Sequence, residues 1–522
     1  MSAHHGRLGS NLGPGGSFRV AGIGSSASQG TMEHVEALFA RAQPFAELIS
    51  PLKFHYANQQ VQELSLTLGL AHDQLRYVLC LFAAYPMAIV YRSLPSASLK
   101  HIFDVVTGIA MAQFVLGSGW VHSLLASTLT LLLVKYGPAQ YAPMIVFTFN
   151  MVYMSVSHIY RLYVDYMGWT LDFTGPQMLL VIKLTSFAYN YYDGVVDKAG
   201  EKMSEMSAGK ARVYAGRKRL AIKELPSLLE FYGYVYSFTT FLAGPAFEIR
   251  EYLDVTTGKK FIHDGKQRNP SSKLAAFSKF VVGIVFMGLF AHFGPNYPLS
   301  NLWSPKIAAL PFLVQVKKLY ITLFFVKAKY YGAWKIAEGS TVLSGFGFQG
   351  FSADGSSLGW NGVSNMDIVG FEFAQSVREG SRAWNKGTQS WLERYVYSRT
   401  NNSLLATYFV SAFWHGFYPG YYIFFMSLPL ATAVNRLAYK RVRPYFLEAD
   451  GSFGMKKKIY DVISVIVTVL TMHYFVMPFQ AMSWEYSLAT LKNTHFLGHI
   501  VCAVLYVVFS LVPVPKSAKK KE

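Results

Sequence analysis

The chain has 522 residues, of which 52% are hydrophobic, 16% aromatic and only 15% charged, with a mean hydropathy of +0.24. Because soluble domains carry about 25% charged residues, this composition excludes a string of soluble domains and indicates a protein that lies in lipid. The formal net charge of +19 does not indicate a nucleic-acid partner, because the Lys and Arg residues gather between apolar runs, as they do near membrane surfaces. The two cysteines, Cys80 and Cys502, lie in separate apolar runs and exclude a disulfide framework or a cysteine metal cluster.

Residues 1–45 are predicted to form a disordered N-terminal tail. Residues 1–30 are rich in Gly, Ser and His, and such a segment cannot bury enough apolar surface to fold. They also lack the apolar stretch of a signal peptide. We therefore expect targeting to depend on the first spanning helix.

Residues 46–515 are predicted to form one membrane body, because apolar segments recur along this whole range. A spanning helix needs about 20 apolar residues to cross a hydrocarbon core of about 30 Å. Several of the segments are short or interrupted, so the prediction is an all-α polytopic membrane protein of about 11 transmembrane or re-entrant helices. In chain order, the candidates are residues 75–91, 102–116, 120–134, 141–163, 176–192, 226–247, 280–293, 307–326, 404–434, 462–482 and 495–514.

The distribution of basic residues predicts which loops lie in the cytosol. Residues 202–223 carry seven Lys and Arg residues against one acid, and the positive-inside rule places such a loop in the cytosol. Residues 248–273 also carry six Lys and Arg residues. This second loop would be lumenal if residues 226–247 span the membrane, so its charge favours a re-entrant 226–247 segment.

The C-terminal residues 516–522 are predicted to form a basic cytosolic tail. They read KSAKKKE, in which Lys519 and Lys520 stand fourth and third from the end. This arrangement resembles the dilysine retrieval signal of endoplasmic reticulum membrane proteins. We therefore expect a multi-pass protein of the endoplasmic reticulum membrane.

Residues 404–434 form a run of 31 residues without a formal charge. As one helix it would measure about 46 Å, well beyond the hydrocarbon core. Pro419 and Gly420 interrupt it, and broken backbone at membrane depth is tolerated only where it is buried in protein or lines a cavity. His415 lies just before this break, so we predict that it faces an internal reaction chamber. The alternative is an ordinary interhelical hydrogen-bond partner.

Residues 385–400 carry basic and aromatic side chains in the pattern of an interfacial helix. Asn385 opens this segment, 30 positions before His415, which leaves room for the helix and for a return to the chamber. A neutral carboxamide suits a low-dielectric site because it offers donors and an acceptor without a buried charge. The alternative role for Asn385 is a helix N-cap.

Two strings, WNKGTQSWL from residue 384 and SAFWHGFYPGYY from residue 411, resemble the paired signature of the membrane-bound O-acyltransferases. The likeness is strongest to the lysophospholipid acyltransferase branch, and within it to the broad-specificity fungal and plant-type enzymes. It extends over residues 70–512. Other stretches that carry it are LDFTGPQMLLVIKL from residue 171, SFAYNYYDG from 186, LAGPAFEIREY from 242 and WNGVSNMDIVGFEFA from 360.

The resemblance implies that the chain transfers a fatty acyl group from acyl-CoA to the free hydroxyl, at sn-2, of a lysophospholipid such as lysophosphatidylcholine or lysophosphatidylethanolamine, and so remodels membrane phospholipids. The invariant histidine and the partner asparagine of the family correspond to His415 and Asn385. His415 would be the general base, and Asn385 would orient it or donate to the thioester oxyanion. Acyl-CoA is a co-substrate, and we expect no cofactor and no metal.

Six further residues in or near these motifs are candidate substrate-binding or supporting residues. Tyr421 and Tyr422 follow the break, where they line a substrate tunnel or serve as ordinary packing aromatics. Asn361 and Glu372 lie in the family-like stretch before Asn385, where we expect them to support the site. The remaining two are the motif tryptophans Trp384 and Trp414.

Three alternatives stand beside this interpretation. A related enzyme of the same family would acylate a sterol, a diacylglycerol or a protein, because the motifs specify chemistry more than acceptor. A membrane transporter also fits broken helices, but it predicts inverted repeats that the sequence does not display. A soluble-type glycerolipid acyltransferase is excluded, because no histidine has an aspartate five positions on.

Overall fold

The computed structural model describes residues 55–68, 70–168, 170–197, 208–448 and 454–514. The described residues belong to one unit that begins at Leu52. The predicted tails 1–45 and 516–522 lie outside the described residues, together with part of the predicted cytosolic loop.

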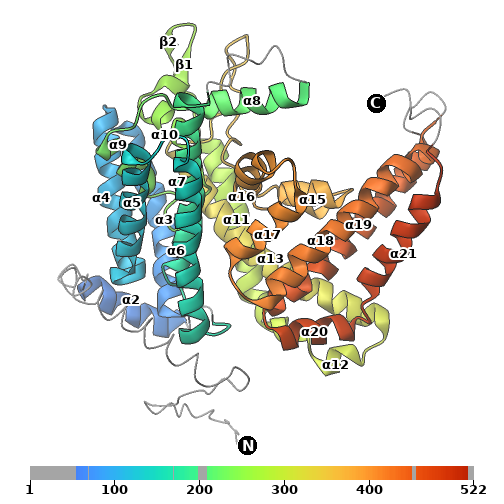
Figure 1. Ribbon diagram of the computed structural model, residues 1–522. Coiled ribbons are helices and arrows are strands. Elements are labelled where there is room, and N and C mark those ends of the chain that lie inside the picture. Colours follow the sequence, from blue (N-terminus) through green and yellow to red (C-terminus); the bar gives the residue numbers. More distant parts are fainter. Residues whose placement is uncertain (1–54, 69, 169, 198–207, 449–453, 515–522) are drawn as a thin grey trace, which may run out of the picture. The chain divides into compact units, whose positions relative to one another are not determined.

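The described residues are almost entirely helical (Figure 1), which confirms the predicted all-α class. Turns and loops connect the helices, and the strand pairings among the described residues are an isolated bridge between Phe351 and Ser357 and one antiparallel hairpin of β1 (Ile262–His263) and β2 (Lys266–Gln267). The first helices are α2 (His55–Leu68), α3 (His72–Ser93), α4 (Ala97–Leu116), α5 (Val121–Tyr136), α6 (Ala142–Val164), α7 (Thr174–Val195), α8 (Ala208–Leu220), α9 (Leu228–Val235) and α10 (Ile249–Thr256).

The second half of the chain contains the long helix α13 and both signature motifs. Its helices are α11 (Lys273–Phe293), α12 (Pro305–Ala308), α13 (Phe312–Leu343), α14 (Ile368–Glu372), α15 (Val377–Ala383), α16 (Lys386–Trp391), α17 (Leu404–His415), α18 (Pro419–Leu437), α19 (Met455–Ala481), α20 (Trp484–Asn493) and α21 (Leu497–Leu511). Short 3-10 or π segments are η2 (Gly117–Trp120), η4 (Lys259–Phe261), η5 (Gly294–Asn296), η6 (Leu299–Leu302), η7 (Leu392–Val396), η8 (Tyr397–Arg399), η9 (Ala438–Val442) and η10 (Arg443–Phe446).

Within the described ranges, five helical segments are long and apolar enough to cross a membrane. They are α3, the stretch Ala97–Tyr136 that contains α4 and α5, α6, α11 with its short extension, and α19. The pair α20 and α21, bent by 66°, makes a sixth span if it crosses as one unit. A multi-pass membrane protein is therefore confirmed, whereas the count of eleven stays a prediction.

Residues 226–247 contain only one helix, α9, of eight residues. Eight residues rise about 12 Å, which is too short to cross the hydrocarbon core. Turns follow this helix, and their aromatic side chains, among them Tyr236 and Phe238, are buried in protein. The segment is therefore not one spanning helix, and its re-entrant topology stays a prediction.

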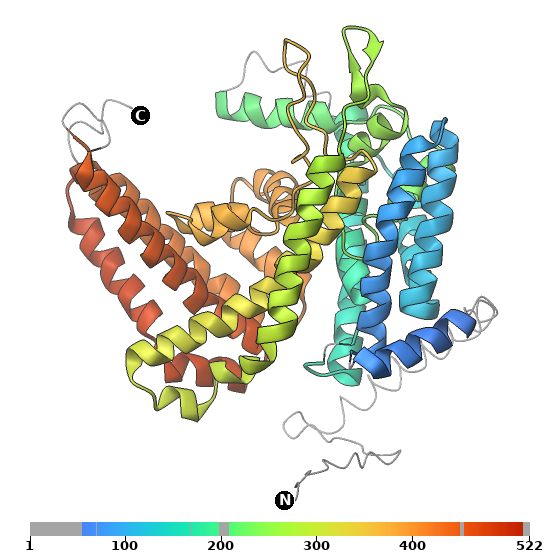
Figure 2. The same cartoon turned by 180° about the vertical axis from the view of Figure 1, so that it is seen from behind.

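Helices α11 and α13 lie side by side, which is clearest from behind (Figure 2). Their contact is close because each contributes a glycine. A Cβ on Gly283 would lie 2.9 Å from the backbone nitrogen of Ile336, and one on Gly332 would lie 3.0 Å from that of Met287. Helix α13 also contacts α3, where the Tyr85 hydroxyl donates to the Ile336 carbonyl at 2.8 Å.

The two signature motifs share one hydrophobic core. Trp391 of α16 and Trp414 of α17 pack with ring centroids 6.3 Å apart. Both indoles are anchored on α7, because the Trp391 nitrogen donates to the Thr185 hydroxyl and the Trp414 nitrogen donates to the Met178 carbonyl, each at 2.9 Å. The residues of this core are Met151, Met154, Val181, Ile182, Tyr189, Trp391, Leu392, Tyr395, Val396 and Trp414.

Candidate active site

The long uncharged run is broken beside His415, as predicted. Helix α17 ends at His415, and α18 begins at Pro419. Gly416 between them has a φ of 118°, a backbone conformation that residues other than glycine rarely adopt. The run therefore lies in two helices joined by a tight turn, and the second helix continues past the run to Leu437.

The imidazole of His415 is held in one tautomer by its own helix. Its Nδ1 lies 2.7 Å from the Ser411 carbonyl oxygen. Because a carbonyl only accepts, Nδ1 carries the proton and Nε2 of the neutral ring has a lone pair. Nε2 has no hydrogen-bond partner among the described residues. This arrangement leaves a basic nitrogen ready to accept a proton.

Aromatic side chains surround the His415 ring. Phe425 and Phe479 lie with ring centroids 5.1 Å away, and Tyr421 lies 5.9 Å away. The histidine is nevertheless only partly buried. The ring of His415 is thus surrounded by aromatic groups and still keeps some accessible surface.

Asn385 stands at the N-cap position of α16, but its side chain makes no capping hydrogen bond. The N-cap interpretation of its carboxamide is therefore wrong. Its backbone is left-handed, with φ 43° and ψ 56°, a conformation that asparagine tolerates better than most residues. The carboxamide has no hydrogen-bond partner in the described part of the chain and is partly exposed.

Backbone hydrogen bonds hold the turn that contains Asn385 from both sides. The Lys386 N–H donates to the carbonyl of Asn365 at 2.8 Å, and the Asp367 N–H donates to the carbonyl of Ala383 at 3.0 Å. The Asn365 Oδ1 also accepts the next amide in α16, that of Gly387, at 3.1 Å. Sequence reasoning missed Asn365, because nothing in the chain marks residues twenty positions apart as partners.

Trp384 and Glu372 both contact α13. The Trp384 ring packs against Tyr330 at 6.1 Å and against Tyr331 at 5.9 Å. The Glu372 carboxylate accepts hydrogen bonds from the Tyr331 hydroxyl at 2.7 Å and from Lys327 at 2.6 Å. Glu372 therefore holds Tyr331, one of the rings on which Trp384 packs.

The remaining candidates divide between the site and the core. Tyr421 packs on His415 with ring centroids 5.9 Å apart, and on Phe479 at 4.6 Å, so it lies beside the candidate base. Tyr422 packs with its ring on Phe409 and lies against the hydrophobic cluster that contains Phe425, one of the rings beside His415.

Trp414 is buried in the core shared by the two motifs. Asn361 accepts from Lys279 at 3.2 Å and belongs to the polar network described below. Among the described residues, no group of three or more His, Cys, Asp and Glu side chains is placed to hold a metal ion.

Comparison with known proteins identifies the family. Residues 159–477 match the sequence profile of the membrane-bound O-acyltransferase family. The chain is 34% identical over 465 residues to a lysophospholipid acyltransferase of Schizosaccharomyces pombe, a match that covers 85% of this chain and 87% of that protein.

Two further relatives come from plants and animals. The chain is 29% identical to lysophospholipid acyltransferase 1 of Arabidopsis thaliana, over 87% of this chain and 97% of that one. It is 30% identical to the human membrane-bound glycerophospholipid O-acyltransferase 2, over 88% and 89% of the two chains. With both signature motifs inside a family match that covers more than half of its length, the chain belongs to the membrane-bound O-acyltransferase family.

Proposed function

We propose that the protein transfers a fatty acyl group from acyl-CoA to the free sn-2 hydroxyl of a lysophospholipid. Its family membership makes it an acyltransferase of membranes, and the names of its relatives supply the acceptor class. The observation that carries the proposal is the His415 ring, whose Nε2 lone pair is fixed by the bond from Nδ1 to the Ser411 carbonyl.

The chemistry requires one proton transfer and one exchange of bonds. As the lipid hydroxyl attacks the thioester carbon, Nε2 of His415 takes its proton, and a new C–O bond forms. The tetrahedral intermediate then collapses, the C–S bond breaks, and His415 returns the proton to the departing thiolate of coenzyme A. A positioned base of this kind contributes about 10²- to 10⁴-fold to the rate.

Asn385 is proposed to act on the same reaction through its carboxamide, which has no hydrogen-bond partner in the described part of the chain. Its N–H group would donate to the oxyanion of the intermediate or orient the imidazole, and loss of one such donor costs about 10²- to 10³-fold. The aromatic side chains around His415 would keep water from the thioester and so prevent hydrolysis. The reaction needs no covalent acyl-enzyme and no cofactor beyond the co-substrate.

Several finer features belong to this proposal. The acceptor is lysophosphatidylcholine, lysophosphatidylethanolamine or a similar lysophospholipid. The body crosses or re-enters the bilayer with about eleven segments. The protein resides in the endoplasmic reticulum membrane, supported by the KSAKKKE tail.

Purified protein incubated with labelled acyl-CoA and a panel of lysophospholipids tests the function directly. We expect label in a diacyl phospholipid, released by a phospholipase that cleaves at sn-2. Labelling of a sterol or a diacylglycerol, with none of any lysophospholipid, would instead identify another acceptor class of the family. Accumulation of unmodified lipid inside vesicles would indicate a transporter.

A further inference from the structure

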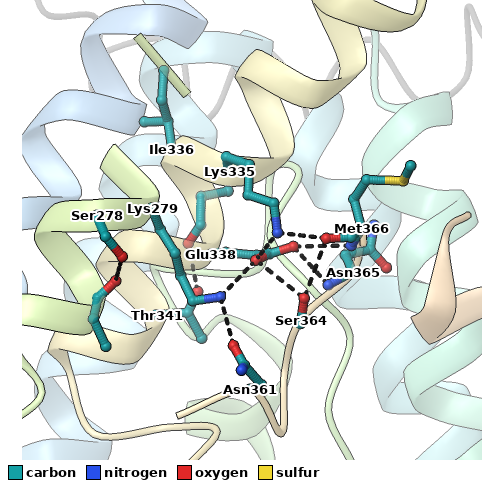
Figure 3. A network of polar contacts seen from close by, with 12 residues as sticks. Ser278, Lys279, Lys335, Ile336, Glu338, Thr341, Asn361, Ser364, Asn365 and Met366 are labelled. Carbon is teal, nitrogen blue, oxygen red and sulfur yellow. Dashed lines mark hydrogen bonds and ion pairs between the residues drawn. The ribbon is translucent and has the colours of Figure 1, made fainter. Parts of the chain in front are cut away.

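Glu338 of α13 lies at the centre of a polar network (Figure 3). Its side chain is fully buried, with an exposed fraction of 0%. The carboxylate forms ion pairs with Lys335 at 2.7 Å and with Lys279 of α11 at 3.0 Å. Burying a carboxylate is costly unless it is paired and hydrogen-bonded, so the surrounding chain must supply donors.

The segment 364–366 supplies those donors from its backbone. Oε1 of Glu338 accepts the N–H of Asn365 at 2.7 Å and the N–H of Met366 at 3.0 Å. Oε2 accepts the Ser364 hydroxyl at 3.4 Å, and Lys335 donates to the Met366 carbonyl. Charge-assisted bonds to two successive amides fix both the position and the direction of this segment.

The same segment holds the turn that contains Asn385. The carbonyl and the side chain of Asn365 accept the amides of Lys386 and Gly387. Asn365 therefore donates its own N–H to Glu338. Its backbone and side-chain oxygens accept the first two amides of α16 and so clamp the start of that helix. The clamp begins one residue after Asn385, whose left-handed backbone needs support from its surroundings.

The close contact between α11 and α13 brings the second lysine, Lys279, into the network. Gly283 and Gly332 let the two backbones meet, so Lys279 reaches across to Glu338. If the two helices lay farther apart, Lys279 on α11 could not reach Glu338, and the carboxylate would lose one of its two lysine partners.

We propose that Glu338 is a positioning residue for acyl transfer, which sets the conformation of the Trp384–Asn385 turn by way of Asn365. This inference rests on the function proposed for Asn385. Glu338 is fully buried, so we infer that it acts on the reaction through the orientation of the Asn385 carboxamide.

The first test replaces Glu338 by Gln in the purified full-length protein. Two ammonium groups then face a neutral amide, and the 364–366 segment shifts. We expect kcat to fall by about 10- to 10²-fold, the cost of a small misplacement near the reaction, while the KM values for acyl-CoA and lysophospholipid stay near those of wild type. Asp104→Asn is the control, because Asp104 is equally buried and bonds Tyr252 on another part of the body.

The second test removes the link in the middle. Asn365→Leu keeps the size of the side chain but leaves the Gly387 amide without its acceptor, and we expect the same fall in kcat. Asn150→Leu is its control, because Asn150 is a fully buried amide that donates to Thr130 of α5. If the controls lower kcat per folded molecule as much as the test variants do, the effect is general destabilisation and the positioning role is refuted.

A double-mutant comparison separates this proposal from the proposed function. Asn385→Gly removes the carboxamide and tolerates the left-handed backbone. If Glu338 acts through Asn385, Glu338→Gln lowers the residual activity of Asn385→Gly no further. If the two substitutions lower activity independently, so that their losses multiply, the positioning role is overturned. A Glu338→Gln enzyme with wild-type kcat would overturn it too, and in both cases the proposed function would stand. Wild-type turnover by Asn385→Gly would overturn the role of Asn385 and this inference together.

Discussion

Nε2 of His158, on α6, lies 3.1 Å from the carbonyl oxygen of Trp414, the residue before His415. This carbonyl belongs to the last turn of α17, where helix carbonyls lack a partner further along the chain. The His158 ring also fills the space beside Gly416, because a Cβ there would lie 2.9 Å from its Nδ1. A histidine from another helix thus holds the end of α17 and the turn that follows it.

His415→Ala should lower acyl transfer by at least about 10²-fold, because the base is lost. Folding should be nearly intact, since only part of this ring is packed. Turnover of detergent-purified protein with labelled acyl-CoA measures the effect. The matched control is His473→Ala on α19, because His473 forms the same bond from Nδ1 to the carbonyl four residues earlier without a helix break beside it. Near wild-type turnover by folded His415→Ala would refute the assignment of the base.

Asn385→Gly should lower kcat by about 10²- to 10³-fold, the loss expected for one oxyanion donor. Glycine is the informative replacement, because alanine would add strain at a φ of 43°. The double variant with His415→Ala should be little worse than either single variant, since residues that act as a unit are not additive. Two losses that multiply would mean that the two side chains serve separate steps.

His158→Phe should lower kcat by about 10-fold or more, because the Trp414 carbonyl loses its donor and the His415 turn shifts. Phenylalanine keeps an aromatic ring beside Gly416, so the packing is largely retained. His158→Gln restores a donor and should recover much of the activity. Equal kcat values for the two variants, whether both high or both low, would show that the hydrogen bond is not what positions the turn.

Changing Lys519 and Lys520 together to Ser should let part of the protein leave the endoplasmic reticulum, because the dilysine arrangement would be lost. Fluorescence microscopy of the tagged full-length chain, with the tag at the N-terminus, measures this. Replacing Lys516 alone, outside the motif, is the control. An unchanged distribution of the double variant would place retention in the membrane body.

The break beside His415 was predictable because its cause is local: a proline and a glycine inside a run too long for one helix. The environment of Asn385 was not, because it depends on Asn365 and Glu338, which approach only when α11, α13 and the intervening loop have folded. Spacing left two roles for Asn385, and only the bond accepted by Asn365 showed how the turn is built.

Apolar composition alone does not separate a spanning helix from a segment buried in protein. Residues 226–247 are as apolar as a spanning helix, but their aromatic side chains face other helices and not lipid. The predicted segment 307–326 covers only part of α13, which continues to Leu343. Its later turns carry Lys327, Lys335 and Glu338 and so do not resemble a membrane helix, yet these charges are paired inside the body.

The backbone partner of His415 has a consequence for the proton balance of the enzyme. A carboxylate hydrogen-bonded to a catalytic histidine stabilises the positive charge of the imidazolium ion, whereas a backbone carbonyl offers only a dipole. In the proposed mechanism the imidazolium of His415 would therefore be short-lived, and the thiolate released in the same turnover would take its proton. The proton enters with the alcohol and leaves with the thiol. In the proposed mechanism each cycle is completed without a proton exchanged with water, so no water needs to reach the reacting groups.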